Sequence, residues 1–165
     1  MTAGDYYITT GEVPESISIM REAANWLIDT GRPMWGLDEL TSERIKNPPE
    51  EFFVLRYESE SAATLTLSFE DSFFWPEIPF GNSGFIHKLA VRRRFAGCGA
   101  AKALIEHCAE ICKTKNIHTL RLDCDPHRKG LCDFYEKCGF ILRNIKTIHT
   151  KLLGDIDVAF YELFF

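Results

Sequence analysis

The sequence has no long apolar run. None of its hydrophobic stretches approaches the ~20 residues that a membrane-spanning helix requires. The first residues, Met-Thr-Ala-Gly-Asp, lack the basic and apolar segments of a secretory signal. We therefore expect a cytoplasmic protein that does not act in a membrane.

Metal-binding patterns are also missing. All six cysteines fall between Cys98 and Cys138, none forms a Cys-x-x-Cys pair, and no histidine spacing completes a zinc site. Free thiols buried in a reducing compartment are the simplest interpretation. We therefore expect no metal and assign no chemistry to the thiols.

Basic stripes interleaved with aromatic residues are absent, which argues against nucleic acid as a principal partner. The charge is instead divided between the sequence halves: residues 1–84 carry a net charge of −10 and residues 85–165 one of +5, which leaves −5 for the chain. The basic half suits a cofactor with several phosphates, and the acidic half would attract a cationic acceptor such as an amine. Solvated helix faces explain the same division equally well.

No internal repeat, low-complexity tract or long linker divides the chain. Its 165 residues, 45% of them hydrophobic, suffice for one sizeable core. We expect a single domain over residues 1–165.

The most informative segment is a glycine-containing turn between a short apolar strand, Phe85 to Val91, and a helix that begins near Ala100. Glycines let the backbone approach a ligand, and the first turn of a helix offers unpaired N–H groups and the positive end of its dipole. Such a turn, with three arginines at 92–94, is typical of a pyrophosphate site. A Walker loop would need Gly-Lys-[Ser/Thr], and a dinucleotide fingerprint a glycine where Lys102 stands, so neither pattern fits.

The segment Ala96-Gly97-Cys98-Gly99-Ala100-Ala101 resembles the [Gln/Arg]-x-x-Gly-x-[Gly/Ala] loop of the GNAT-type N-acetyltransferases. Downstream, residues 134–140 resemble the Phe-Tyr-Glu-Lys-x-Gly-Phe segment of the same family. Two positions depart from the family: Ala96 replaces the leading Gln or Arg, and Arg128 stands where an Asn is usual. The resemblance covers about residues 52–165.

The resemblance implies roles for named residues. Tyr135 matches the usual proton donor to the departing thiolate. Asp123 aligns with a carboxylate that one branch of the family uses as base. His87 is a second candidate from its position alone, because it lies two residues before Leu89 on the strand and should face the same side; Glu70, Asp71 and Glu77 are further options on the acceptor side. The residues implied in cofactor binding are Leu89, Ala90, Val91, Arg92, Arg94, Ala96, Gly97, Cys98, Gly99, Ala100, Ala101, Lys102, Arg128 and Tyr135.

Hydrophobic periodicity predicts the elements. Strands are expected at residues 6–9, 52–57, 62–69, 85–91, 117–124, 140–147 and 158–164, and helices at 14–30, 37–46, 100–115 and 130–137. This order is similar to the GNAT fold. It implies an α/β protein with a mixed, mostly antiparallel central sheet, splayed fourth and fifth strands, and helices on both faces.

We therefore predict an enzyme that transfers an acetyl group from acetyl-CoA to a primary amine of a small molecule or peptide by direct attack. Two other classes stay open: a non-catalytic acyl-CoA sensor or interaction domain, and a nucleotide-phosphate enzyme. The apolar terminal strand, residues 161–165, is a candidate for pairing across a homodimer.

Overall fold

The structure is a computed structural model that describes residues 5–45, 50–151 and 153–165. The chain forms two compact units, Met1–Ser68 with Ile86–Cys108, and Phe69–Phe85 with Ala109–Phe165. Strand β4 (Gly84–Val91) and helix α2 (Ala100–Thr114) each run through both units. That the whole chain is one domain stays a prediction.

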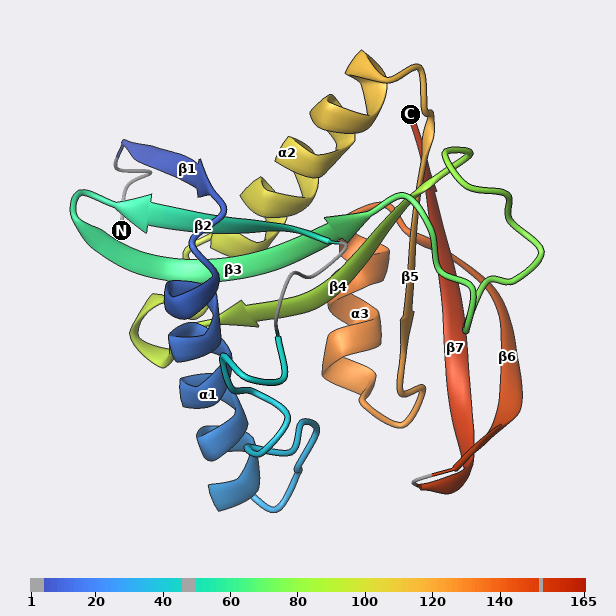
Figure 1. Ribbon diagram of the computed structural model, residues 1–165, viewed down its shortest axis with the longest axis horizontal. Coiled ribbons are helices and arrows are strands. Elements are labelled where there is room, and N and C mark those ends of the chain that lie inside the picture. The colour runs from blue at the N-terminus through green and yellow to red at the C-terminus, as the bar shows by residue number, and fades with distance from the viewer. Residues whose placement is uncertain (1–4, 46–49, 152) are drawn as a thin grey trace. The chain divides into compact units, whose positions relative to one another are not determined.

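The first unit is a sheet covered by helices (Figure 1). The unit contains β1 (Tyr6–Thr10), β2 (Glu51–Tyr57) and β3 (Glu60–Ser68). Strand β2 pairs antiparallel with β1 on one side and with β3 on the other, and β4 lies next to β3 in the sheet. Helix α1 (Val13–Asp29) starts with a proline in its first turn, where the missing N–H costs no hydrogen bond. A 3₁₀ turn, η1 (Arg93–Phe95), links β4 to α2.

Side chains of β2 alternate between the two helices. Phe52 and Val54 pack with Ile19 and Met20 of α1, and all four are almost fully buried. Phe53 points to the other face, where its ring meets His107 of α2 edge-on at 5.2 Å. This alternation follows from the two-residue period of a strand, and it places helices on both faces of the sheet.

The second unit contains β5 (Thr119–Cys124), α3 (Lys129–Lys137), β6 (Ile141–Thr150) and β7 (Gly154–Phe164). Strand β7 lies between β5 and β6 and is antiparallel to both, while Gly84 and Phe85 of β4 pair in parallel with β5. Buried side chains on one face form a small core, Trp75, Phe85, Val158 and Phe160. The complete hydrogen-bonded order is β1-β2-β3-β4-β5-β7-β6.

The predicted fold class is confirmed: an α/β fold with a mixed, mostly antiparallel sheet. Among the described residues, β4 pairs with β5 only at Gly84 and Phe85, which is the expected parting of these two strands. None of the helices described has the length and apolarity to cross a membrane.

One prediction about an element was wrong. The expected helix at 37–46 forms turns over its described residues, 37–45, because Arg21 of α1 binds the Leu37 and Leu40 carbonyl oxygens (2.7 and 3.1 Å) that a helical ladder would use. Strand β7 is paired with β5 along one side and, up to Glu162, with β6 along the other. Pairing across a homodimer through residues 161–165 stays a prediction.

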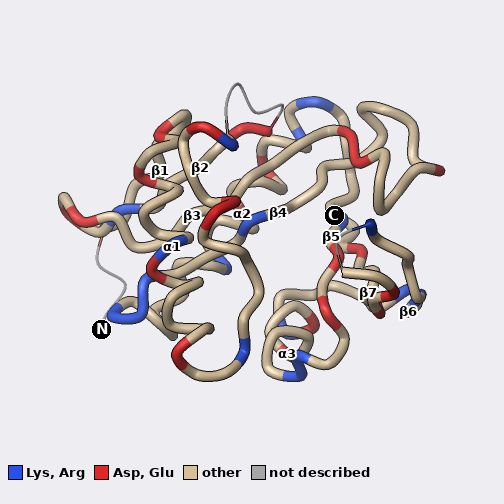
Figure 2. Tube along the Cα trace, turned by 60° about the horizontal axis from the view of Figure 1, so that its bottom comes forward, with Lys and Arg blue, Asp and Glu red and all other residues tan. Residues whose placement is uncertain are grey.

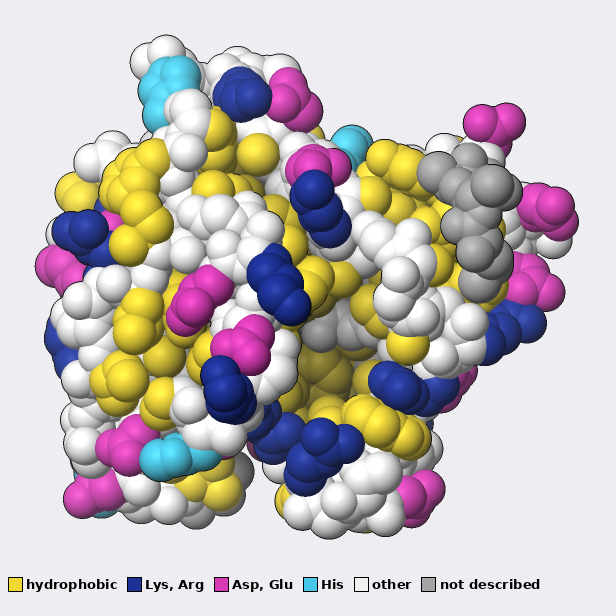
Figure 3. All heavy atoms as spheres, turned by 180° about the vertical axis from the view of Figure 1, so that it is seen from behind, with side chains coloured by type: hydrophobic (Ala, Val, Ile, Leu, Met, Phe, Trp, Pro, Cys, Tyr) yellow, Lys and Arg dark blue, Asp and Glu magenta, His cyan; other side chains and the backbone are white. Residues whose placement is uncertain are grey.

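Folding mixes charges that the sequence separates. The first unit contains 10 Lys and Arg against 13 Asp and Glu, and the second 9 against 11, so the net charges are −3 and −2. Figure 2 shows both signs along the whole trace, and the face in Figure 3 mixes apolar side chains with acidic and basic ones. The division of charge between sequence halves therefore does not describe the folded units.

Candidate active site

In the first unit, the glycine turn between β4 and α2 is held by a hydrogen bond where it leaves β4, and its backbone is exposed where it approaches α2. Where β4 ends, Arg92 N–H donates to the Ala62 carbonyl of β3 (2.8 Å), and η1 follows. Gly97 and Gly99 have φ of 78° and 89°, a region that favours glycine. A Cβ built at either position meets no atom within 4 Å, so packing does not explain these glycines. Both are exposed, which leaves the backbone open to a ligand.

Helix α2 begins directly after this turn. Its ladder starts with Ala103 N–H donating to the Gly99 carbonyl (3.0 Å). The N–H groups of residues 99–102 precede this bond, and none of them is paired with a backbone acceptor in the described part of the chain. Such donors, together with the helix dipole, bind anions. Lys102 adds an exposed ammonium, 3.7 Å from Glu106.

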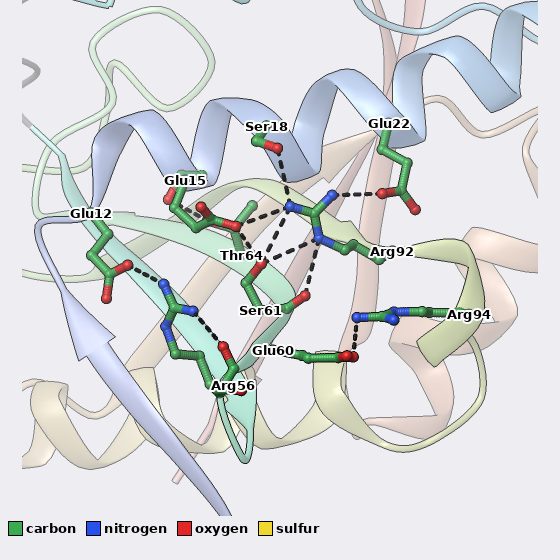
Figure 4. Close-up of polar contacts among 12 residues, drawn as sticks. Glu12, Glu15, Ser18, Glu22, Arg56, Glu60, Ser61, Thr64, Arg92 and Arg94 are labelled. Atoms are coloured by element: carbon green, nitrogen blue, oxygen red, sulfur yellow. Dashed lines mark hydrogen bonds and ion pairs between the residues drawn. The ribbon is translucent and has the colours of Figure 1, made fainter.

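The arginines of the loop face other parts of the protein (Figure 4). The Arg92 guanidinium donates to Glu22 through Nη1 (2.6 Å), to Glu15 and Ser18 through Nη2 (3.0 Å each), and to the Ser61 carbonyl through Nε (3.0 Å). Arg94 forms an ion pair with Glu60 and lies over the Phe95 ring. Both guanidinium groups hold the loop to its surroundings. Phosphate binding by either one stays a prediction.

Further contacts fix the loop. Glu22 also accepts the Arg93 N–H (3.0 Å), and the Arg93 guanidinium lies 3.8 Å from the centre of the Trp26 ring. On the other side, the Tyr57 hydroxyl donates to the Cys98 carbonyl (3.3 Å), and the Tyr57 ring stacks on Phe95. The backbone of residues 92–98 is therefore positioned before any ligand binds.

Strand β4 leads into this loop through an irregular residue. Lys88 has a φ of 53°, which costs a residue with a side chain about 1–2 kcal/mol, and its ammonium donates to Glu50 (2.7 Å). His87 precedes it, half-buried, and its carbonyl accepts from Thr66 (3.1 Å). After Lys88, Ala90 packs in the α1 core while Leu89 and Val91 are half-buried. Backbone groups of residues 89–91 lie beyond the described β5 pairing, where they can bind an extended ligand.

Two candidate catalytic residues belong to the second unit. Burial, with a smaller contribution from the Asp71 carboxylate, raises the pKa of Asp123 to about 7. Its Oδ1 is buried and, among the described residues, has no hydrogen-bond partner. Tyr135 of α3 is 7% exposed, packed between Phe134, Phe140 and Tyr161, and burial raises the pKa of its phenol. A carboxyl that titrates near neutrality suits a base, while burial keeps the phenol protonated and makes it a weaker acid.

Arg128 stands at the N-cap of α3, with its Nε 3.6 Å from the Asp125 carboxylate. The predicted site residues therefore form two sets. Residues 89–102 and His87 belong to the first unit, and Asp123, Arg128 and Tyr135 to the second.

The sequence alone did not reveal the residues that hold the loop. Glu15, Ser18, Glu22 and Trp26 form one stripe of α1, spaced by three or four residues. This stripe lies beside the apolar face of the helix, and in the sequence its polar residues look like those of any solvated helix surface. Only their spacing of three or four residues could have indicated a shared contact.

The sequence model of the acetyltransferase (GNAT) family matches residues 20–140, which include β4, the glycine turn and Tyr135. The chain belongs to this family.

The chain is also similar to individual acetyltransferases, in sequence or in fold. The uncharacterized N-acetyltransferase YesJ of Bacillus subtilis (strain 168) is 28% identical over 141 residues, which cover 78% of this chain and 77% of YesJ. The crystal structure of the ribosomal-protein-S18-alanine N-acetyltransferase of Escherichia coli has a TM-score of 0.67 at 18% identity and covers 96% of this chain and 93% of its own. An acetyltransferase of Bacillus anthracis (strain Ames) in complex with acetyl coenzyme A has a TM-score of 0.60 at 22% identity, covering 75% and 67%.

Membership in the GNAT family makes this protein an acetyl-CoA-dependent acyltransferase. The glycine turn fits that co-substrate. Acetyl-CoA carries a pyrophosphate, and the open N–H groups of residues 99–102 lie at the positive end of the α2 dipole. Ala96 lacks the Gln or Arg side chain that the family loop usually has at this position, but the backbone donors of residues 99–102 do not depend on that side chain.

Proposed function

We propose that this GNAT protein transfers the acetyl group of acetyl-CoA directly to a primary amine of a small molecule or peptide. The observation that carries the proposal is the row of N–H groups at residues 99–102, which begins at the second of two exposed glycines with open space around them. In this proposal the row binds the pyrophosphate. The backbone of residues 89–91 holds the pantetheine arm, and one of its N–H groups polarises the acetyl carbonyl.

The proton steps are assigned by family resemblance and by the environment of each side chain. The neutral amine attacks the thioester carbon, the tetrahedral oxyanion collapses, and the C–S bond breaks. Tyr135 donates its proton to the departing thiolate, in line with a phenol that burial keeps protonated. Asp123 takes the proton of the acceptor ammonium, because its pKa of about 7 lets it act as a base near neutral pH. His87 is the second candidate for this step.

Calorimetric titration with CoA tests the carrying observation. The unmodified protein should bind CoA, and Gly99→Ala should weaken binding by about tenfold or more, because alanine disfavours a φ of 89° and so turns the N–H groups away. Gly130→Ala is the matched control. Gly130 lies in α3 without a positive φ, and an added Cβ there also meets no atom within 4 Å.

The acceptor is identified by following free CoA release over a panel of amines, from polyamines to peptide N-termini. Release that depends on one amine class supports transfer. A folded protein with no affinity for CoA would refute the binding role of the glycine turn, and CoA binding without release for any amine would refute acetyl transfer.

A further inference from the structure

Two cysteines of the second unit lie in contact. Cys124 is the last residue of β5 and Cys132 is in the first turn of α3, and their sulfur atoms are 3.9 Å apart. The Cys132 sulfur also lies 3.8 Å from the Asp125 carbonyl oxygen and 3.9 Å from that of Pro126. Both thiols are half-buried, unlike the buried Cys108 and Cys112 of α2. A small oxidant can therefore reach a pair whose partners already touch.

We propose that Cys124 and Cys132 are a paired oxidation site, which a hydroperoxide closes to an intramolecular disulfide. A disulfide has an S–S length of about 2.05 Å, so the two sulfur atoms must approach by about 2 Å. Rotation of two side chains at the ends of a short connection can supply this movement. The other half-buried cysteine of α3, Cys138, is at the opposite end of the helix.

The chemistry needs hydrogen peroxide and nothing else. The Cys132 thiolate attacks one peroxide oxygen, the O–O bond breaks, and the departing hydroxide takes a proton to give sulfenic acid and water. The Cys124 sulfur then attacks the sulfenic sulfur: the S–S bond forms, the S–O bond breaks, and the hydroxide leaves as water with the Cys124 proton. Two thiols lose two electrons and two protons, and one peroxide becomes two waters.

The order of these steps follows from the surroundings of Cys124. Burial first, and then the adjacent Cys132, raise the pKa of the Cys124 thiol. Cys124 therefore stays protonated, which suits the thiol that attacks in the second step and gives up its proton there.

The pair joins the two segments that carry the candidate acid and base. Asp123 directly precedes Cys124 on β5, and Tyr135 follows Cys132 by one turn of α3. This consequence rests on the proposed function. A covalent link between the end of β5 and the start of α3 shifts both side chains, and misplacement of catalytic groups by about 1 Å can lower a rate by about 10²-fold.

The test has a covalent readout that does not depend on activity. The folded protein is treated with hydrogen peroxide, the remaining thiols are blocked, and its peptides are mapped by mass spectrometry. We expect a cross-linked peptide joining Cys124 to Cys132 that lacks two hydrogen masses and separates on reduction. Cys132→Ser should abolish it, and Cys138→Ser, the matched control, should keep it.

Oxidation of Cys132 to sulfinic acid without the cross-link, or the same cross-link yield in urea-unfolded protein, would overturn the proposal. Acetyl transfer is then assayed on the reduced, oxidised and re-reduced samples. Loss by about tenfold or more on oxidation, restored by reduction and absent in Cys132→Ser, supports the link to the catalytic residues. A cross-linked protein of unchanged activity would refute that link alone, while inactive reduced protein would count against the proposed function and leave the cross-link standing.

Discussion

At the scale of single residues, Tyr135 offers the sharpest test of the catalytic assignment. Tyr135→Phe keeps the ring that packs against Phe140 and Tyr161 and removes only the hydroxyl. If the phenol protonates the leaving thiolate, kcat falls by about 10²-fold while KM for acetyl-CoA stays within about twofold. Steady-state kinetics checks this split. Equal kcat values would remove Tyr135 from the mechanism, and a raised KM with unchanged kcat would make it a binding residue.

Asp123 gives a prediction about pH. Because burial raises its pKa to about 7, a base at this position is protonated and inactive below that pH, so kcat/KM should rise through about pH 7. Asp123→Asn should remove this limb of the profile. If the limb persists in the Asn variant and disappears in His87→Gln, His87 is the base.

The raised pKa of Asp123 also makes the stability of the fold depend on pH. The folded protein holds the Asp123 proton more tightly than the unfolded chain, whose value is 3.8, so stability is lost as pH rises through about 7. The Asn variant, which never ionises, should therefore gain melting temperature over the parent at pH 8, and this advantage should be smaller at pH 5. Equal differences at both pH values would contradict the raised pKa.

The motifs predicted candidate residues whose patterns are local. Gly97, Gly99 and Tyr135 could be proposed from the sequence because a helix N-terminus and one short segment contain the patterns that point to them. Arg92 could not be understood in this way. Its partners Glu15 and Glu22 lie 77 and 70 residues away, and only tertiary packing brings them to the guanidinium.

At the scale of elements, α1 holds the loop that leads into the glycine turn. Glu22 accepts from both the Arg92 side chain and the Arg93 backbone, so Glu22→Gln weakens two charge-assisted hydrogen bonds at the loop entrance. KM for acetyl-CoA should rise about three- to tenfold with little change in kcat, since Glu22 positions the loop and does not touch the reacting atoms. Glu110→Gln, which breaks an exposed ion pair with Lys113 on α2, is the control. A fall in kcat with unchanged KM would refute the positioning role.

Element prediction succeeded where periodicity and termination signals agreed. Helix α1 was expected at 14–30 and runs over 13–29, and α2 was expected at 100–115 and runs over 100–114. The segment 37–46 had helical spacing but a tertiary competitor, because the carbonyls of Leu37 and Leu40 accept from Arg21. A sequence pattern contains no information about a donor on another helix.

At the scale of the whole molecule, carboxyls with lowered and with raised pKa values give opposite responses to acid. In the first unit, a hydrogen bond from Arg56 lowers the pKa of Glu12, and one from Ser61 lowers that of Glu15 against the effect of burial. For Glu50, burial acts to raise the pKa, but Lys88 outweighs it and the net shift is downward. The second unit contains Asp123, whose pKa is raised.

The raised pKa of Asp123 and the lowered pKa values in the first unit have opposite consequences, although the pKa of the exposed Asp157 of the second unit is also lowered. A carboxyl with a lowered pKa stabilises the fold above its unfolded value, 4.5 for Glu, and that stability is lost as pH falls below it. Asp123 acts the other way and favours the fold as pH falls from about 7 toward 3.8. Hydrogen exchange, corrected for the intrinsic pH dependence of the rate, should show β5 peptides gaining protection between pH 7 and 5 while α1 and β2 peptides stay unchanged. Below about pH 4.5 the α1 and β2 peptides should lose protection first.

Variants of the carboxyls test which group causes each change in hydrogen-exchange protection. Glu15→Gln should flatten the acid limb of the α1 and β2 peptides, and Asp123→Asn should remove the gain in the β5 peptides. Parallel loss of protection in both sets, at the same pH and in both variants, would mean that the two units respond to acid as one cooperative structure and that these carboxyls do not set its stability.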